Sequence, residues 1–247
     1  MKAQVSANIH PTAIVDPAAR ISDSCIIGPY CIIGDAVEMG ENCELISHVV
    51  LKGPTRMGAG NRVFPFTTLG LEPQDLKFRG EKTRLEIGDN NTIRESVTIH
   101  RGTPGGGGIT TVGNNCLIMA NAATLAGHVT VEDFAVVGAL CPVHQYVRIG
   151  AYSYIGGGTT ITQDVLPFSL TSAKRDVHAF GMNSVGLERR GFSKERIKKI
   201  HHAYRALLSS KLNIGQALEK LKSEGGLGED VEILLRFVEG SERGVLR

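Results

Sequence analysis

The sequence predicts a mainly β fold, a parallel β-helix of hexapeptide repeats followed by a small C-terminal α-helical domain. Over long stretches an aliphatic residue recurs at every sixth position, and a glycine often follows it. A period of six fits neither an α-helix nor an isolated strand, which repeat every ~3.6 and ~2 residues. It is typical of a prism whose flat faces are short parallel strands. Three hexads close one triangular coil, so we expect residues 18 apart in the sequence to stack at ~4.8 Å.

The repeat delimits the β-helix within the chain. Its aliphatic positions are Ile9, Val15, Ile21, Ile27, Ile33, Met39, Leu45, Leu51, Met57, Val63 and Leu69, then Ile87, Ile93 and Ile99, and then Met119, Leu125, Val131, Val137, Val143, Ile149, Ile155 and Ile161. Met119 lies seven residues after Val112, so we expect one residue to bulge between them. We predict a β-helical domain over residues 1–167 and a helical domain over residues 168–247.

The cysteines occupy one recurrent position, four residues after an aliphatic residue of the repeat. They are Cys25, Cys31, Cys43, Cys116 and Cys141. Other repeats carry alanine, valine or threonine there, so we expect a small inward-facing side chain, and free cysteine packs as a small hydrophobe. This pattern argues against a disulfide framework or a metal cluster and favours a reducing cytoplasm.

The rest of the composition narrows the class of protein. Aromatic residues make up only 5% and tryptophan is absent, as suits a narrow prism with little room for large rings. The sequence shows neither an apolar signal region nor an apolar run of transmembrane length, so we expect no membrane span. The formal net charge of +2 gives no indication of nucleic-acid binding.

Two polar segments interrupt the repeat. Residues 71–84 carry Pro73 and Gly80 and predict an excursion loop, and the repeat keeps its phase because Leu69 and Ile87 are 18 residues apart. Residues 101–111 contain a run of glycines. Because no Gly-Lys-Ser/Thr follows the run and no strand-to-helix pattern surrounds it, we interpret the segment as a loop rather than a phosphate cradle.

Helical spacing replaces the repeat after Pro167. A short helix is expected to end near Arg190, and Ser193 is a predicted N-cap for a helix whose apolar face begins at Ile197. Two further helices are expected near residues 214–223 and 230–239. Residues 174–211 hold ten Lys/Arg against three Asp/Glu. This excess fits either a solvated helix face or a docking site for an acidic partner or a diphosphate.

Six segments resemble the UDP-N-acetylglucosamine O-acyltransferases that begin lipid A biosynthesis. They are IHPTAIV at 9–15, QDLK at 74–77, IRESVTIHRG at 93–102, NAATLAGH at 121–128, VHQY at 143–146 and GLERRGFS at 186–193. The resemblance implies a left-handed β-helix and a homotrimer with clefts between its subunits. It also implies transfer of a 3-hydroxyacyl chain from acyl carrier protein to the 3-hydroxyl of UDP-N-acetylglucosamine, with no cofactor beyond the carrier's phosphopantetheine arm.

The chain departs from this family at one place. The resemblance implies a further coil before Asn121, with a His-x-x-His-Asp segment whose second histidine is the general base. Here NNCLIM runs directly into ANAATLAGH, so about one coil is missing. Acyl transfer from a thioester needs a base that titrates near neutrality and a donor for the oxyanion. We predict His128 as the base and the backbone amide of Gly127 as the oxyanion donor.

Other site residues follow from the resemblance. His128 and His144 come after aliphatic residues 18 apart, so we expect them on one face of adjacent coils. The predicted substrate contacts are Gln74, Asp75, Lys77, His144, Gln145, Gly157, Asn183, Arg189 and Arg190. The arginines suit phosphate oxygens, and a glycine at the floor of the acyl groove leaves space for a longer chain. We interpret His10, His48 and His100 as structural.

Two other classes of protein share these features. A gamma-type carbonic anhydrase uses the same prism with zinc held by three histidines, but the local spacing of those ligands is absent here, so we expect no metal. A catalytically silent trimeric scaffold that binds nucleotide sugar or carrier protein fits the missing coil.

Overall fold

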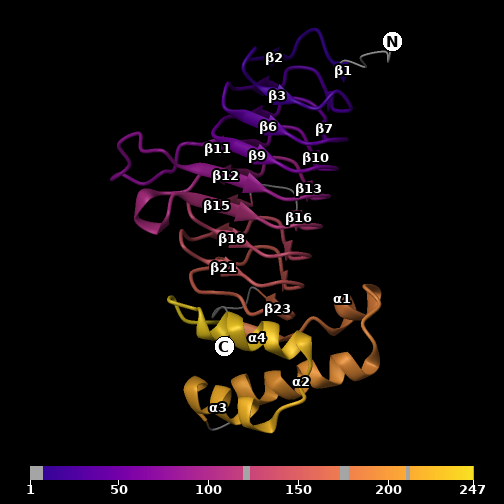
Figure 1. The fold of residues 1–247 in the computed structure, drawn as a ribbon, viewed down its shortest axis with the longest axis vertical. Coiled ribbons are helices and arrows are strands. Elements are labelled where there is room, and N and C mark those ends of the chain that lie inside the picture. Colours follow the sequence, from indigo (N-terminus) through magenta and orange to yellow (C-terminus); the bar gives the residue numbers. More distant parts are fainter. Residues whose placement is uncertain (1–7, 119–122, 173–177, 210–211, 247) are drawn as a thin grey trace.

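The structure, a computed structural model, describes residues 8–118, 123–172, 178–209 and 212–246. It is a three-sided prism of short parallel strands, the left-handed parallel β-helix that was predicted, with α-helices packed at its C-terminal end (Figure 1). Each side of the prism is one sheet, named sheet A, B or C below.

Successive coils contribute one strand to each sheet. Sheet A contains β1 (Asn8–Ile9), β4 (Ile26–Ile27), β7 (Glu44–Leu45), β10 (Arg62–Val63), β13 (Thr92–Ile93), β16 (Leu117–Ile118), β19 (Val136–Val137), β22 (Tyr154–Ile155), β23 (Ser169–Ser172) and β24 (His178–Met182). Sheet B contains β2 (Ile14–Val15), β5 (Ile32–Ile33), β8 (Val50–Leu51), β11 (Thr68–Leu71), β14 (Thr98–His100), β17 (Thr124–Leu125) and β20 (Pro142–Val143). Sheet C contains β3 (Arg20–Ile21), β6 (Val37–Met39), β9 (Thr55–Met57), β12 (Arg84–Ile87), β15 (Ile109–Val112), β18 (Thr130–Val131) and β21 (Arg148–Ile149). Within the described residues these strands form seven complete coils, and β22 begins an eighth that continues through bridges at Ile161 and Val165.

The aliphatic positions of the repeat fill the interior of the prism. From Ile27 to Ile161 the described members of the series are buried, and residues of successive coils pair in parallel register. All five cysteines are buried and free, which confirms the small inward position they were assigned. Burial of each aliphatic side chain contributes about 1.5–3 kcal/mol, so the repeat itself supplies the main stabilisation of this domain.

Both excursion loops add residues between sheet B and sheet C. Ile87 pairs with Met57, which lies 30 residues earlier, so the first loop adds twelve residues to the usual 18. The expected stacking of Leu69 on Ile87 is therefore wrong, because Leu69 pairs with Ile99 instead. Twelve is a multiple of six, so the repeat keeps its phase while skipping two faces. A period in the sequence cannot reveal such a skip.

The irregularity near the second loop lies later than expected. Ile118, fully buried, pairs with both Ile93 and Val137. It follows Val112 by six residues, so the bulge expected between Val112 and Met119 is wrong. The extra residue falls between Ile118 and Leu125, and Met119 lies outside the described residues. Two adjacent apolar residues look alike in a hydrophobic pattern, and only the hydrogen-bonded register separates them.

The C-terminal helices follow the expected pattern. They are α1 (Ser184–Arg189), α2 (Lys194–Ser209), α3 (Ile214–Glu224) and α4 (Glu229–Glu239), and one short 3₁₀ turn, η1 (Pro104–Gly106), lies in the second loop. The hydroxyl of Ser193 accepts the N–H of Arg196 at 3.3 Å, as an N-cap does. The apolar face of α2 packs with α3 and α4 into a second hydrophobic cluster.

The two hydrophobic clusters divide near Pro167. One fills the prism as far as Val165, and the other begins at Leu166 and Phe168. Sheet A continues past this point, since β23 pairs in parallel with β22 and antiparallel with β24. A domain boundary between residues 167 and 168 stays a prediction.

The register at β16 predicts a clear difference between two neighbouring positions. Replacing the inward Ile118 with alanine should lower the free energy of unfolding by about 2–5 kcal/mol, because it opens a cavity in the core. Leu117→Ala is the matched control, since Leu117 points outward and is only partly buried. Urea unfolding checks both variants, and an equal or larger loss for Leu117→Ala would contradict the register.

Candidate active site

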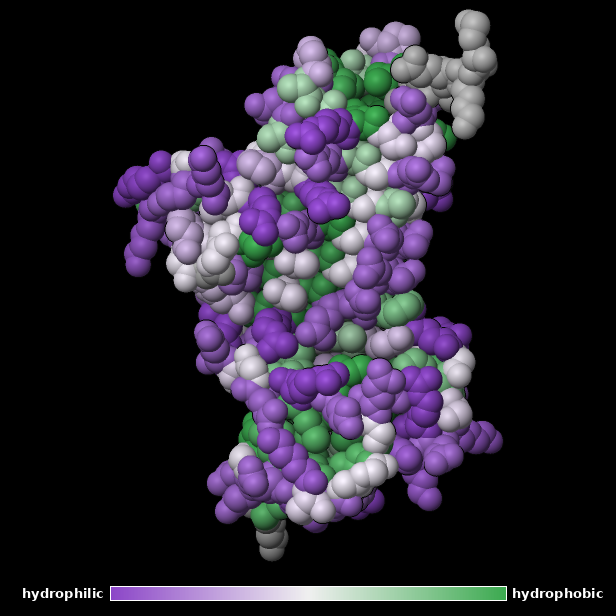
Figure 2. Space-filling model, in the orientation of Figure 1, coloured by the Kyte–Doolittle hydropathy of each residue, from purple (hydrophilic) through white to green (hydrophobic). Residues whose placement is uncertain are grey.

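Both excursion loops leave the prism at the corner between sheets B and C, on consecutive coils. The first connects β11 to β12 and the second connects β14 to β15. In Figure 1 both protrude from the same side of the prism. The first loop, residues 71–84, is hydrophilic in Figure 2. A site built at this corner therefore draws on segments that are far apart in the sequence.

A cavity of about 180 Å³ lies under the first loop at this corner. Its lining residues are Pro73, Gln74, Asp75, His100, Thr124, Ala126, Gly127, His144 and Gln145. Five of them are predicted site residues: Gln74, Asp75, Gly127, His144 and Gln145. The structure thus brings together four of the segments that carry the family resemblance, QDLK, IRESVTIHRG, NAATLAGH and VHQY.

Gly127 is the point at which both loops close on the prism. A Cβ atom there would lie 3.0 Å from the carbonyl oxygen of Arg101, 3.1 Å from Thr103 Cγ2 and 3.2 Å from Pro73 Cβ. These contacts are tight on three sides, so a larger residue would push its neighbours away. Glycine suits this position because the backbone of the second loop and side chains of both loops approach it closely.

Arg101 fixes the first loop to the prism. Its side chain is only 12% exposed, and its guanidinium donates to the carbonyl of Gly53 at 3.1 Å and to the Glu72 carboxylate at 3.3 Å. The same group lies over the ring of Phe78, 5.5 Å from the centroid. Glu72 and Phe78 flank the segment that carries Gln74 and Asp75, so Arg101 helps to set where that segment lies.

Asp75 and Lys77 are tied to each other through the backbone. The Asp75 carboxylate accepts the N–H of Lys77 at 2.9 Å, and the Asp75 carbonyl accepts the N–H of Phe78 at 2.9 Å. This turn directs Asp75 to the cavity and leaves Lys77 exposed outside its lining. A role for Lys77 in binding stays a prediction.

His100 lines the cavity but is not among the predicted site residues. We interpreted it as structural, yet it lines the cavity and is only 4% exposed. Burial lowers its pKa, against the opposing effect of a hydrogen bond with the backbone of Leu125. The signal was available in the sequence, because His100 and His144 each follow an inward aliphatic residue by one position.

His128 does not share this cavity. It follows Leu125 by three positions, whereas His144 follows Val143 by one, so the expectation that both lie on one face is wrong. His128 lines a separate cavity of about 730 Å³ with Arg148 and Arg243, and its ring centroid lies 5.0 Å from that of Tyr146. Burial lowers the pKa of His128, again opposed by a backbone hydrogen bond.

Asn183, Arg189 and Arg190 line a third cavity, of about 690 Å³, against sheet A. Asn183 caps α1 by accepting the N–H of Gly186, and its amide donates to the carbonyl of Tyr152 at 3.1 Å. The guanidinium of Arg190 lies 4.9 Å from the ring centroid of Phe134. These residues and the Asp75 cavity therefore belong to different faces of one chain.

Gly157 lies apart from all three cavities. It is exposed at the corner between sheets A and B, where a Cβ would meet the carbonyl of Ala139 at 3.2 Å. The predicted role of Gly157 at the floor of an acyl groove stays a prediction.

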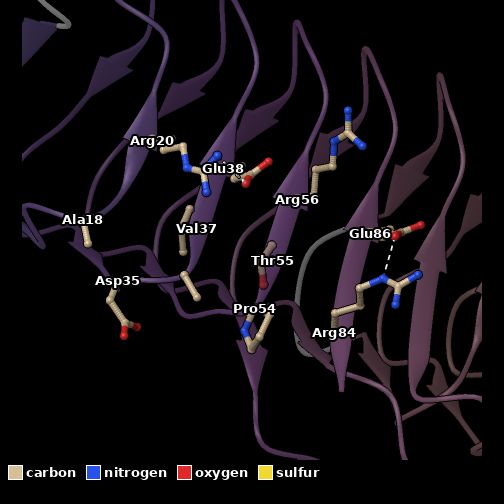
Figure 3. Close-up of a pocket in the computed structure, with 11 residues that line it drawn as sticks. Ala18, Arg20, Asp35, Val37, Glu38, Pro54, Thr55, Arg56, Arg84 and Glu86 are labelled. Atoms are coloured by element: carbon tan, nitrogen blue, oxygen red, sulfur yellow. Dashed lines mark hydrogen bonds and ion pairs between the residues drawn. The ribbon is translucent and has the colours of Figure 1, made fainter. Parts of the chain in front are cut away.

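A further cavity, of about 320 Å³, lies on sheet C and contains none of the predicted residues. Figure 3 shows Arg20, Glu38, Arg56 and Glu86 on successive strands, with charges of alternating sign. Arg20 and Glu38 pair at 3.3 Å. Such exposed pairs contribute at most ~1 kcal/mol each, and the arrangement is that of a solvated face. In the described part of the chain no group of three His, Cys, Asp or Glu side chains could hold a metal ion.

Comparison with known proteins decides the family. Residues 164–246 match the profile described as UDP N-acetylglucosamine O-acyltransferase, domain 2. The UDP-N-acetylglucosamine O-acyltransferase of Moraxella catarrhalis is 38% identical, with 97% of this chain and 100% of that chain covered and a TM-score of 0.82. The chain belongs to the UDP-N-acetylglucosamine O-acyltransferase family.

Two other solved members of the family agree. The enzyme of Bacteroides fragilis is 37% identical, covers 97% of this chain and 100% of its own, and has a TM-score of 0.83. That of Francisella novicida is 34% identical, covers 97% of this chain and 94% of its own, and has a TM-score of 0.82. In the described part of the chain, no helix has the length and apolar character needed to cross a membrane.

The buried histidines predict how stability depends on pH. Burial lowers the pKa of His100 and His128, whereas an unfolded histidine titrates near ~6.5. Below about pH 6.5 the unfolded chain then binds more protons than the folded chain, so the free energy of unfolding should fall as the pH is lowered.

Urea unfolding at pH 7.5, 6.0 and 5.0, at one protein concentration, measures this effect. His100→Gln should lose less stability between pH 7.5 and 5.0 than the native chain. His10→Gln, at an exposed histidine of the first coil, is the matched control and should follow the native chain. Identical pH dependence of stability in His100→Gln and the native chain would contradict the predicted contribution of His100.

Proposed function

We propose that the chain transfers a 3-hydroxyacyl group from acyl carrier protein to the 3-hydroxyl of UDP-N-acetylglucosamine, the first step of lipid A biosynthesis. The observation that carries this proposal is the cavity at the corner of sheets B and C. Gln74, Asp75 and His144 come from distant motifs of the family and line that single cavity. Relatives that match over nearly the whole chain are acyltransferases of this nucleotide sugar by name.

The residues in the cavity suit a sugar acceptor. The Asp75 carboxylate and the amides of Gln74 and Gln145 supply acceptors and donors for hydroxyl groups, and the imidazole of His144 supplies a base. The backbone amide of Gly127 is the oxyanion donor that we propose for the thioester carbonyl. No cofactor is needed, because the phosphopantetheine arm arrives with the carrier.

The carrier protein is proposed to dock on the helical domain. The exposed side chains of α2 include Lys194 and Lys198, while Arg196 is held by Asp230 at 2.8 Å. Arg189 and Arg190 lie at the cavity against sheet A and suit phosphate oxygens. A basic face of this kind attracts an acidic carrier chiefly by raising its association rate.

Two observations support a homotrimer. Most of the predicted site residues lie either in the cavity at the sheet B and C corner or in the cavity on sheet A, so we propose that a complete site draws one part from each of two neighbouring chains. The outward positions of sheet B also carry no charge. They are Ile14, Ile32, Val50, Thr68, Thr98, Thr124 and Pro142. The matching positions of sheet C hold a ladder of charges, so we propose sheet B as the face that meets the other chains.

A charge placed on sheet B tests this assembly. Light scattering of the native chain should give the mass of a trimer with or without reductant, because the cysteines are buried and free. Val50→Lys should lower that mass, since an unpaired ammonium would be buried in the interface. Thr111→Lys, on the charged sheet C, is the control and should leave it unchanged. A monomeric native chain, or dissociation by reductant, would refute the trimer.

A silent scaffold is the second candidate, and one observation favours it. The coil that carries the general base in the family has no counterpart, because β16 and β17 are successive faces of a single coil. Such a chain would bind nucleotide sugar or carrier protein without turnover. For either candidate the free, buried cysteines suit a reducing compartment, and we propose a cytoplasmic location.

An assay with both substrates separates the two candidates. The chain should consume 3-hydroxyacyl thioester on acyl carrier protein only when UDP-N-acetylglucosamine is present. Asp75→Asn should lower kcat/KM by about tenfold or more, since a charge-assisted hydrogen bond contributes about 1.5–3 kcal/mol. Lys82→Gln, in the same loop but outside the cavity, is the control. Calorimetric binding of the nucleotide sugar without thioester consumption would establish the scaffold instead.

A further inference from the structure

Three equivalent positions of sheet B line one wall of the cavity. His100, Ala126 and His144 each follow the inward residue of β14, β17 and β20 by one position, and those inward residues stack in register. Neighbouring strands are ~4.8 Å apart, so the two histidines lie two strand spacings apart with a methyl group between them. Alanine at the middle position leaves a recess flanked by two imidazoles that face the same cavity.

The protonation of His144 follows from its hydrogen bond. Its Nδ1 lies 3.1 Å from the carbonyl oxygen of Gln145. A carbonyl oxygen can only accept, so Nδ1 carries the hydrogen, and in the neutral ring Nε2 keeps its lone pair. The N–H of His144 donates to the carbonyl of Ile161 at 2.8 Å, which fixes the backbone that carries the ring. His144 is exposed at the cavity, so a substrate can reach it.

The other two histidines near this corner are less suited to act as a base that a substrate in this cavity can reach. His100 is almost fully buried, so it can flank a substrate but offers little surface to one. His128 lines the neighbouring cavity and packs against Tyr146. Its backbone N–H also donates to the hydroxyl of Thr110 at 2.7 Å, which fixes the backbone of this residue at the corner.

We propose that His144 is the general base of this chain, in place of the histidine of the missing coil. This inference rests on the acyl transfer proposed above. Nε2 of His144 takes the proton of the sugar hydroxyl as the hydroxyl oxygen attacks the thioester carbonyl. The new C–O bond forms, the C–S bond breaks, and the leaving thiolate recovers the proton from the imidazolium. Ala126 provides the space in which the hydroxyl lies beside the ring.

Single-turnover acyl transfer with native protein and histidine variants tests the assignment. His144→Gln and His144→Ala should each lower the rate by ~10²–10⁴-fold, because a positioned general base contributes that much. The dissociation constant for UDP-N-acetylglucosamine should change by less than about tenfold, since the proton is moved only in the transition state. His128→Gln should cost less than about tenfold in rate, and His10→Gln should match the native chain.

The outcomes separate this inference from the proposed function. If His144→Gln retains the acyl transfer of the native chain, His144 is not the general base, and the proposed function still stands. A larger loss in His128→Gln than in His144→Gln also overturns His144 as the base and assigns the base to His128. Nucleotide-sugar binding by a native chain that transfers no acyl group overturns both the reaction and the base. Melting temperatures equal to that of the native chain show that the rate losses are not losses of folded protein.

Discussion

The stacking of identical hexad positions from coil to coil is the constraint on which this molecule depends. Each strand is only two to four residues long in most coils, too short to be stable by itself. Parallel hydrogen bonds to the coils above and below, and an unbroken interior of aliphatic side chains, stabilise all of them together. Because the interior is narrow and regular, loops leave at corners, and the candidate active site forms where two of them leave the same corner.

The candidate active site follows from that geometry. Two loops begin at the same corner on consecutive coils, and both contact the next coil at Gly127. Gly127 lets both loops approach the prism, and Arg101 holds the first loop by contacts to two earlier turns of the prism and to Glu72. The side chains that can act on a substrate then come from repeat positions of the prism. His100 and His144 occupy the same repeat position on different coils of sheet B and so lie in one column along the prism. Rigid placement of this kind is what acyl transfer requires of a base and an oxyanion donor.

A solenoid tolerates the gain or loss of a coil because each coil contacts only its neighbours. The change does not leave the column of functional groups untouched, since removing a coil brings the following residues of the column closer to the preceding ones. In this chain the column runs from His100 through Ala126 to His144. Loss of a coil would therefore keep the fold and change which residues lie next to one another in the column.

The sequence by itself determined the class of fold, most of the buried positions, the inward cysteines and the C-terminal helices, because a period of six and a helical period are local patterns that need no partner. Through their motifs it also singled out Gln74, Asp75, Gly127 and His144, which line one cavity in the structure. Only the tertiary structure decided which hexads stack across the loops, that Ile118 rather than a neighbour faces inward, and that His100 lines the Asp75 cavity while His128 lines another. Those outcomes depend on hydrogen-bonded register and on which face each insertion skips. The hexapeptide repeat determines neither the register nor the skipped faces, since every hexad can occupy any of the three faces.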